Sequence, residues 1–407
     1  MASSLLTPCL LLLLGSFTLV APEVHFANQD GTVPYFERGC GEDLSNLWLE
    51  IVFVVDNSRG MTTLGLQEVA THIVSVMMNV KVGLKSNNPR TSGVGIVTYN
   101  QNATVAANLD AFSSTDDFVN GVFQSLSSVA DTYESYVSKG LLAAANVLDK
   151  GYRSDRESVK QLIIVYASTY SDANNNDPVP LAHRLWTSGI STSTVAFSQL
   201  NLNTLEQKLS KIASPGLNFT YTDNNLVGSI QTGLTQTNCF CPNGWTQYRQ
   251  SYGDAASSKF GVCLKPVVLP SNWIGAKSSC NHQWNNGYLV NEYSQQKHDY
   301  VLNLVHDTPA FQHPYKYHIG LSYYNSYWYW EQPVGLGAIP LSTASFAFSG
   351  WTPGFPVIDS TKMVAMNSET ATNSTGWQNI VRTTENQFYV CEVAACDTDN
   401  YCSSVDN

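Results

Sequence analysis

The first half of the chain alternates between continuous apolar runs and segments with a single apolar stripe, and this alternation constrains the fold most. The run LEIVFVVD, Leu49–Asp56, is apolar and β-branched almost throughout, as a strand buried on both faces requires. Apolar side chains then recur at helical spacing from Val69 to Val80. A buried strand followed by an amphipathic helix is typical of a parallel sheet.

The same alternation continues to about Thr237. Further strands are expected at Ser92–Asn100, Ala103–Leu109 and Gln161–Ser168, and a helix start is expected at Ser114, three residues before Asp117. The pattern predicts an α/β, doubly wound, mostly parallel sheet with helices on both faces. In such a sheet ligands bind beyond the carboxyl ends of the strands, which is where the first run ends.

Length, charge and the N-terminus narrow the class of protein. A chain of 407 residues is too long for one ordinary core, so two domains are expected. A net charge of -11 without a basic run argues against a nucleic-acid partner. The apolar stretch within residues 1–21 predicts a signal peptide and a secreted protein, although MASS lacks a basic residue and an uncleaved anchor is the alternative. No later run reaches the roughly 18 apolar residues of a membrane span.

The cysteines and sequons agree with an extracellular protein. Of nine cysteines, Cys9 lies in the predicted signal peptide, and the even set that remains favours disulfides over zinc or catalytic thiols. Asn102, Asn218 and Asn373 begin Asn-x-Ser/Thr sequons and are predicted glycosylation sites.

The first strand ends in Asp56-Asn-Ser58-Arg-Gly60. With this loop and the alternating strands, residues 48–237 resemble the von Willebrand factor type A domain. That family has a metal-ion-dependent adhesion site with Asp-x-Ser-x-Ser at this position, a hydroxyl from a second loop, and an Asp after the fourth buried strand. The resemblance implies that Asp56, Ser58 and Ser135 are the residues of this chain that would be ligands of a divalent cation.

Two positions depart from that pattern. Gly60 replaces the second serine, and Ser168 lies where the family has an aspartate, while Asp172 is displaced along the chain. With one carboxylate left, Mg²⁺ would bind weakly because it gives up its water shell reluctantly. We therefore expect a degraded site with at most weak Mg²⁺ or Ca²⁺ binding, and no firm cofactor. The favoured role of Asp56 is to cap the next helix or to bind loop amides.

After Cys239 the chain changes to short segments rich in aromatic residues, Gly and Pro. It reads Cys241-Pro-Asn-Gly-Trp, later Trp328-Tyr-Trp330, and finally Tyr389-Val-Cys391-Glu392. Residues 241–393 thus resemble the α+β C-type lectin-like domain, followed by a polar tail over 394–407. A type A domain joined to a lectin-like domain resembles a group of secreted nematode proteins.

The lectin resemblance implies two disulfides, Cys241–Cys263 and Cys280–Cys391. Of the remaining cysteines, Cys40 and Cys239 flank the first domain and could bridge its ends, and Cys396 and Cys402 could close a loop in the tail. The inner disulfide of the family is absent at both ends.

The calcium site of sugar-binding lectins is also altered. Where the family has Glu-Pro-Asn or Gln-Pro-Asp, the chain reads Phe355-Pro-Val, and where the family has Trp-Asn-Asp it reads Trp377-Gln378-Asn379. Because Ca²⁺ needs several oxygen ligands, calcium-dependent sugar binding of the usual kind is not expected. Phe355, Trp377, Gln378 and Asn379 remain candidate ligand-binding residues.

An aromatic stretch offers another way to bind. In Tyr323–Trp330, alternation places some rings in the core and others outside, where they could stack on sugars or pack against a protein; an aromatic-rich core hairpin is the favoured interpretation. Trp328 and Trp330 are core candidates by their place in the family pattern. No motif of a hydrolase, metalloprotease or phosphate-binding enzyme is present, His298 and His306 are expected to be solvated, and we predict no enzyme.

Together these patterns predict a secreted, non-catalytic recognition protein. The resemblance implies glycan or surface binding in innate immune defence, without the usual calcium-dependent sugar site. The expected partner is an extracellular glycan or protein, and the oligomeric state stays open. The alternative is an extracellular adhesive or matrix protein that acts through protein contacts of its type A domain.

Overall fold

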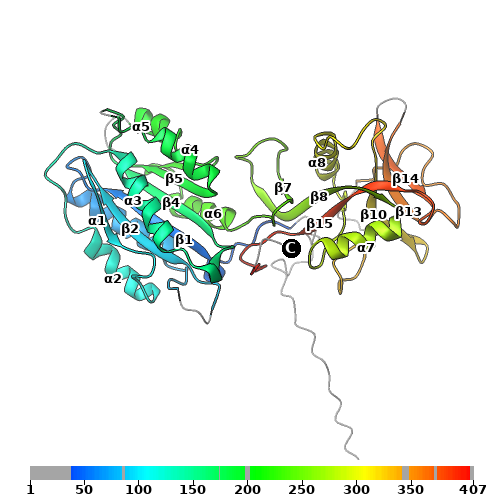
Figure 1. The fold of residues 1–407 in the computed structure, drawn as a ribbon, viewed down its shortest axis with the longest axis horizontal. Coiled ribbons are helices and arrows are strands. Elements are labelled where there is room, and N and C mark those ends of the chain that lie inside the picture. The colour runs from blue at the N-terminus through cyan, green and yellow to red at the C-terminus, as the bar shows by residue number, and fades with distance from the viewer. Residues whose placement is uncertain are drawn as a thin grey trace, which may run out of the picture.

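The computed structural model describes residues 38–84, 88–173, 175–197, 202–341, 348–370 and 374–403. Two domains lie side by side along the long axis of the molecule (Figure 1). The predicted signal peptide and the sequon at Asn373 lie outside the described residues.

The N-terminal domain is built on one six-stranded sheet. Its strands are β1 (Leu49–Asp56), β2 (Gly93–Tyr99), β3 (Ala103–Ala107), β4 (Lys160–Ala167), β5 (Ile190–Ala196) and β6 (Asn218–Thr220). They are ordered β3-β2-β1-β4-β5-β6, with only β3 antiparallel to its neighbour. Every residue of β1 is buried, as its continuous apolar run predicts.

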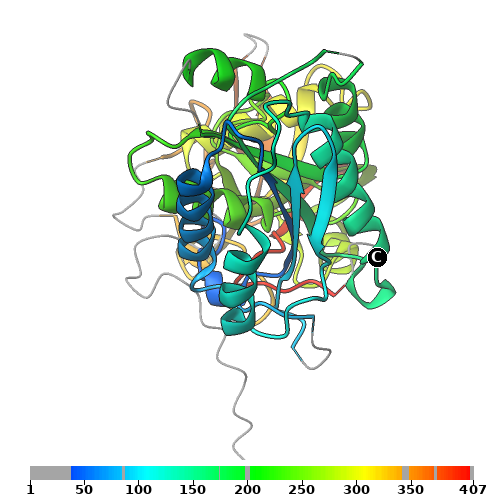
Figure 2. The ribbon, with the colours of Figure 1, turned by 90° about the vertical axis from the view of Figure 1, so that its left-hand side faces the viewer.

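Helices cover both faces of this sheet (Figure 2). They are α1 (Thr63–Met77), α2 (Thr115–Ser125), α3 (Val137–Lys150), α4 (Val179–Thr187), α5 (Leu202–Leu209) and α6 (Leu226–Thr237). Side chains alternate along a strand, so Phe53 of β1 packs with α1, α2 and α6, while Val52 and Val54 pack with α3, α4 and α5. The predicted helix start is confirmed, because Ser114 Oγ accepts a hydrogen bond of 3.1 Å from the Asp117 amide.

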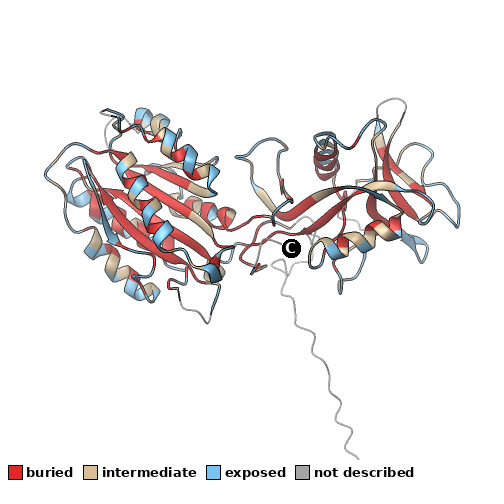
Figure 3. Ribbon diagram, viewed as in Figure 1, coloured by how far each residue is buried: buried red, intermediate tan, exposed pale blue. Residues whose placement is uncertain are grey.

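The C-terminal domain is an α+β fold around a sheet that is mostly antiparallel. Its elements are β7 (Thr246–Arg249), β8 (Lys259–Ser271), α7 (Trp273–Gln283), β9 (Tyr288–Leu289), α8 (Gln295–His306), β10 (Lys316–Tyr324), β11 (Tyr327–Trp330), β12 (Ile339–Pro340), β13 (Val364–Glu369), β14 (Thr375–Ile380) and β15 (Gln387–Ala394). The last strand, β15, pairs with β8 and so joins the two ends of the domain. In Figure 3 the strands of both domains are largely buried, and the helices expose their outer faces.

Four disulfides connect the predicted pairs: Cys40–Cys239, Cys241–Cys263, Cys280–Cys391 and Cys396–Cys402. The pair Cys280–Cys391 ties α7 to β15 across 111 residues of sequence. A crosslink over a loop of this length stabilises the fold by about 4 to 5 kcal/mol in the chain-entropy model.

The segment after β15 is not a free tail over its described part. It packs Cys396 and Cys402 against Trp48 and Phe240 in a small apolar cluster between the domains. The Ser158 hydroxyl, just before β4, donates a hydrogen bond of 3.0 Å to the carbonyl of Cys402. The tail therefore links the domains, which its polar composition did not predict.

Candidate functional site

The centre of the candidate site is the carboxylate of Asp56, which is buried at the end of β1. Parallel pairing places Val55 of β1 opposite Tyr166 of β4, so the loops after both strands meet at one edge of the sheet. One carboxylate oxygen of Asp56 accepts a hydrogen bond of 2.9 Å from the Ser58 amide. The other accepts bonds of 3.2 Å from the amide and 2.6 Å from the hydroxyl of Ser168. Donors from both loops thus hold the carboxylate in place.

The two predicted serine ligands also lie at this edge. Ser58 and Ser135 are buried, and the Ser58 hydroxyl makes no hydrogen bond with another described group. Ser135 Oγ lacks a well-formed hydrogen bond and lies close to the hydroxyl of Tyr99. Burial, and then the negative charge of Asp56, raise the pKa of Tyr99 well above its usual value. The sequence pattern therefore brought together three residues, Asp56, Ser58 and Ser135, that lie at the same end of the sheet in the structure.

The two departures from the family pattern are neighbours in space. A Cβ atom added to Gly60 would lie 3.0 Å from the hydroxyl oxygen of Ser168 and 3.6 Å from that of Ser58. The space beside residue 60 is therefore shared with the hydroxyl that bonds Asp56. Sequence reasoning treated Ser168 only as a missing carboxylate, whereas the structure makes it the main hydrogen-bond partner of Asp56.

The residues present do not fit a tightly held divalent cation. Asp56 contributes one carboxylate, and both of its oxygens already accept hydrogen bonds from the chain. Asp172 is exposed and faces Lys208, with a nitrogen-oxygen distance of 3.6 Å. Among the described residues, no three His, Cys, Asp or Glu side chains gather as a metal site would require. The geometry matches the favoured role of Asp56, in which its carboxylate binds loop amides.

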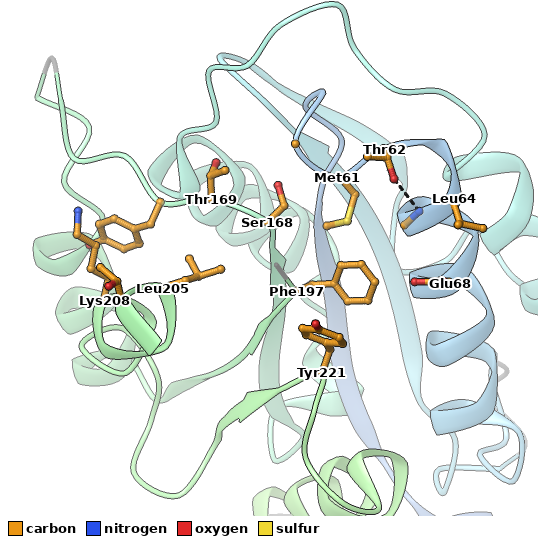
Figure 4. Close-up of a pocket in the computed structure, with 14 residues that line it drawn as sticks. Met61, Thr62, Leu64, Glu68, Ser168, Thr169, Phe197, Leu205, Lys208 and Tyr221 are labelled. Carbon is orange, nitrogen blue, oxygen red and sulfur yellow. Dashed lines mark hydrogen bonds between the residues drawn. The ribbon is translucent and has the colours of Figure 1, made fainter. Parts of the chain in front are cut away.

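A cavity of about 570 Å³ opens beside this centre (Figure 4). Its wall comes from residues 60–68 at the start of α1, residues 168–170 after β4, Phe197 after β5, residues 204–208 of α5, and Tyr221 after β6. No sequence motif indicates this cavity, because its wall is assembled from five separate segments of the chain.

Two of the candidate ligand-binding residues in the C-terminal domain have internal roles. Trp377 is fully buried, and its indole nitrogen donates a hydrogen bond of 2.6 Å to Glu292. Asn379 is also buried, and its side chain bonds the backbone of Val357 in both directions and the carbonyl of Lys362. The prediction is therefore corrected for Trp377 and Asn379, because neither side chain is free to contact a ligand.

Phe355 and Gln378 are half-buried and keep some exposed surface. Asn379 holds the loop that carries Phe355, through its bonds to Val357.

Among the sequons, Asn102 is exposed, while Asn218 is half-buried and accepts a 2.6 Å hydrogen bond from the Thr194 hydroxyl.

Sequence reasoning missed two buried ion pairs in the C-terminal domain. Lys297 lies 2.8 Å from both carboxylate oxygens of Glu392. Next to it, His298 lies 2.7 Å from Glu292, so the expectation that His298 is solvated is wrong. Burial alone would lower the pKa of His298, but the charge and hydrogen bond of Glu292 outweigh it and raise that pKa. The sequence signal for these ion pairs was that two adjacent residues of α8, Lys297 and His298, are polar at positions that face the core.

The aromatic hairpin of β10 and β11 has both exposed and buried rings, but their exposure does not alternate strictly along the strands. Tyr323, Tyr324 and Tyr327 are 37%, 65% and 57% exposed, whereas Trp330 is completely buried. Trp328 is only half-buried, with its ring 4.8 Å from that of Trp351. We call Tyr324 and Tyr327, which pair across the hairpin, the tyrosine face; Tyr323 points to the opposite face, with its ring 5.3 Å from that of Trp328. Within the described residues, no helix is both long enough and apolar enough to cross a membrane.

Comparison with known proteins agrees with both domains. Residues 50–233 match the model of the von Willebrand factor type A domain. C-type lectin domain-containing protein 160 of Caenorhabditis elegans is 29% identical over 391 residues, which cover 92% of this chain and 58% of that protein. Snaclec 3 of Sistrurus catenatus edwardsii is 35% identical over 72 residues, 18% of this chain and 40% of the snaclec. The chain thus spans less than two thirds of these relatives.

Two solved structures were also found to be similar. Proximal thread matrix protein 1 from the mussel byssus matches with a TM-score of 0.38 and 18% identity, over 46% of this chain and 44% of that one. Human lithostathine matches with a TM-score of 0.29 and 19% identity, over 38% of this chain and 90% of its own.

Proposed function

The chain carries a von Willebrand factor type A domain followed by a C-type lectin-like domain, and from this premise we propose that it is a secreted, non-catalytic recognition protein. Its proposed task is to bind glycans or glycan-bearing surfaces in innate immune defence, without the usual calcium site. Four disulfides support an extracellular location, where such bonds persist.

The tyrosine face is the observation that carries the proposal of glycan binding. Flat rings stack on the apolar faces of sugars, and tyrosine hydroxyls can bond the sugar hydroxyls at the same time. The rings come from facing strands, since Tyr324 pairs with Tyr327 across the hairpin. Among the described residues of this region, Asn379 is buried and bonded to the backbone of Val357, and Val357 has no side-chain oxygen, so neither side chain supplies a calcium ligand.

A glycan array probed with the whole protein, with and without EDTA, tests this proposal. We expect binding that EDTA does not change and that the double substitution Tyr324→Ala/Tyr327→Ala weakens at least about tenfold. Tyr133→Ala is the matched control, because Tyr133 is an exposed tyrosine of the other domain. Loss of binding in EDTA, or no glycan bound at all, would refute the proposal.

The second candidate is an adhesive or matrix protein that acts through its type A domain. The cavity beside Ser168 favours it, because ligands of such sheets bind at the carboxyl ends of the strands. Binding to an array of extracellular proteins, unaffected by Tyr324→Ala/Tyr327→Ala, would support this function over glycan recognition.

A further inference from the structure

The cavity of the type A domain lies beyond the carboxyl ends of β1 and β4, where the strand order of the sheet changes direction. The chain passes from β1 to β2 on one side and later to β4 on the other, so β1 and β4 form the switch point of the sheet. Open α/β sheets bind ligands in the crevice at this point. The volume of about 570 Å³ falls within the range of small-molecule sites.

Part of the cavity wall is apolar and aromatic. Met61 and Leu205 are buried in its wall, and the rings of Phe197 and Tyr221 lie with their centroids 5.3 Å apart. A Cβ atom on Gly65 would approach the Phe197 ring to 3.2 Å, so part of the open space depends on glycine at this position. Such a wall accommodates a flat hydrocarbon body.

The charged group at the cavity that has no ionic partner among the described residues is an acidic one. Within the described residues, the carboxyl group of Glu68 takes part in no ion pair or hydrogen bond, and Figure 4 shows it turned towards Phe197. Lys208 is the cation of the lining, but it lies 3.6 Å from Asp172 and over the ring of Tyr170, at 5.1 Å from the ring centre. A cationic ligand is therefore favoured over an anionic one.

The cavity does not depend on a metal ion. The Ser168 hydroxyl on its wall is already bonded to Asp56, so the carboxylate of Asp56 is held away from ligands. Recognition is left to the apolar wall, the aromatic faces and Glu68. Aromatic faces attract ammonium groups, which adds to the effect of the carboxylate.

We propose that this cavity binds a small organic ammonium ion with an aromatic body, that is, an arylalkylamine. The ring lies against Phe197 and Tyr221, and the ammonium group lies at Glu68. This binding is separate from the proposed glycan recognition, because the tyrosine face belongs to the other domain.

Isothermal titration of the full chain with phenethylamine and with 3-phenylpropionate, which carries the opposite charge, tests the proposal. We expect a dissociation constant of about 1 mM or tighter for the amine, as suits so small a ligand, and at least about tenfold weaker binding of the acid. EDTA should change neither value. No measurable heat with the amine, or equal affinity for the two probes, would overturn the proposal.

Variants of the wall sharpen the test. Glu68→Gln should weaken amine binding roughly fivefold, as removal of an exposed charge partner does, and leave the acid unaffected or bound more tightly. Glu157→Gln is the control, since Glu157 is an exposed carboxylate before β4, at the opposite end of the strands. Gly65→Ala narrows the cavity, and Tyr221→Ala removes a partly exposed ring without touching the core. If both of these leave amine affinity unchanged, the proposal is wrong.

Discussion

Asp56 in the type A domain and two glutamates in the lectin-like domain are buried carboxylates that are held in different ways. In the type A domain, Asp56 is bonded by neutral donors: two backbone amides and the hydroxyl of Ser168. In the lectin-like domain, Glu292 and Glu392 face the cationic side chains of His298 and Lys297. The first arrangement lies at the edge of a sheet beside a cavity, and the second lies inside a core.

This difference determines how much stability is lost when a partner of the buried carboxylate is removed by substitution. A neutral donor can be removed at moderate cost, because the carboxylate keeps its remaining hydrogen bonds. A buried charge that loses its partner is left in a medium that solvates it poorly, and this is much more costly. We therefore expect the edge of the type A sheet to accept redesign and the lectin core to resist it.

The largest effect is expected for Lys297→Met. Both Lys297 and Glu392 are completely buried, so the variant leaves the Glu392 charge without its partner. Loss of one partner of a buried pair lowers the free energy of unfolding by about 3 to 5 kcal/mol. Denaturant unfolding followed by tryptophan fluorescence measures this change.

The matched control is Arg59→Met, which breaks the exposed pair of Arg59 with Asp131. An exposed pair contributes about 1 kcal/mol or less. Equal losses in the two variants would show that burial does not separate the two kinds of ion pair.

A smaller loss is expected for Ser168→Ala in the type A domain. The variant removes the 2.6 Å hydrogen bond to Asp56 but keeps the two amide donors. Hydrogen bonds to charged groups contribute about 1.5 to 3 kcal/mol, and the same unfolding experiment measures the loss. Ser75→Ala, in an exposed position of α1, should change stability very little. A loss as large as that of Lys297→Met would contradict the distinction between the domains.

The double substitution Gly60→Ser/Ser168→Asp should restore a metal site. It supplies the missing hydroxyl and the missing carboxylate together, at two positions that are neighbours in space. We expect Mg²⁺ affinity to rise at least about tenfold, a gain of about 1.4 kcal/mol, in isothermal titration with Mg²⁺, Mn²⁺ and Ca²⁺. Adding Asp56→Ala should abolish the gain. Micromolar binding by the unaltered protein that Asp56→Ala removes would show that the site is intact.

The smallest effect is expected for the pH dependence of the His298–Glu292 pair. The raised pKa of His298 means that its stabilisation is complete below about pH 6.5, the ordinary value, and is lost as the pH rises through the folded-state pKa. The lowered pKa of Glu292 keeps that carboxylate charged in this window. The melting temperature of the unaltered protein should therefore exceed that of His298→Gln most at about pH 6 and least at alkaline pH. A constant difference would contradict this assignment.

The order of elements could be predicted because it follows from local patterns. A β-branched run such as Leu49–Asp56 is stable only between two apolar layers, and the stripe from Val69 to Val80 supplies part of one. The corner of the fold that holds Asp56, Ser58 and Ser135 was also predictable, since a known loop pattern follows the first strand. The four disulfide pairs were predictable from cysteine positions and family resemblance.

The roles of particular side chains could not be predicted in the same way. His298 looks like a surface residue of a polar helix until Glu292, on a different segment, lies opposite it. Trp377 and Asn379 match a ligand-binding motif in sequence, yet one donates to Glu292 and the other anchors a loop. Each outcome depends on a partner that lies outside the helix or strand of the residue itself.

Sequence alone therefore indicated the α/β fold through local periodicity, and resemblance to known families indicated the lectin-like fold, the disulfide pairs and the place of the altered metal loop. Only the tertiary structure decided that Ser168 bonds Asp56, that the tail packs between the domains, and that a cavity with a free Glu68 opens at the sheet edge. Hydrogen bonds and cavities depend on distances between separate segments, and the local sequence of one segment does not determine those distances.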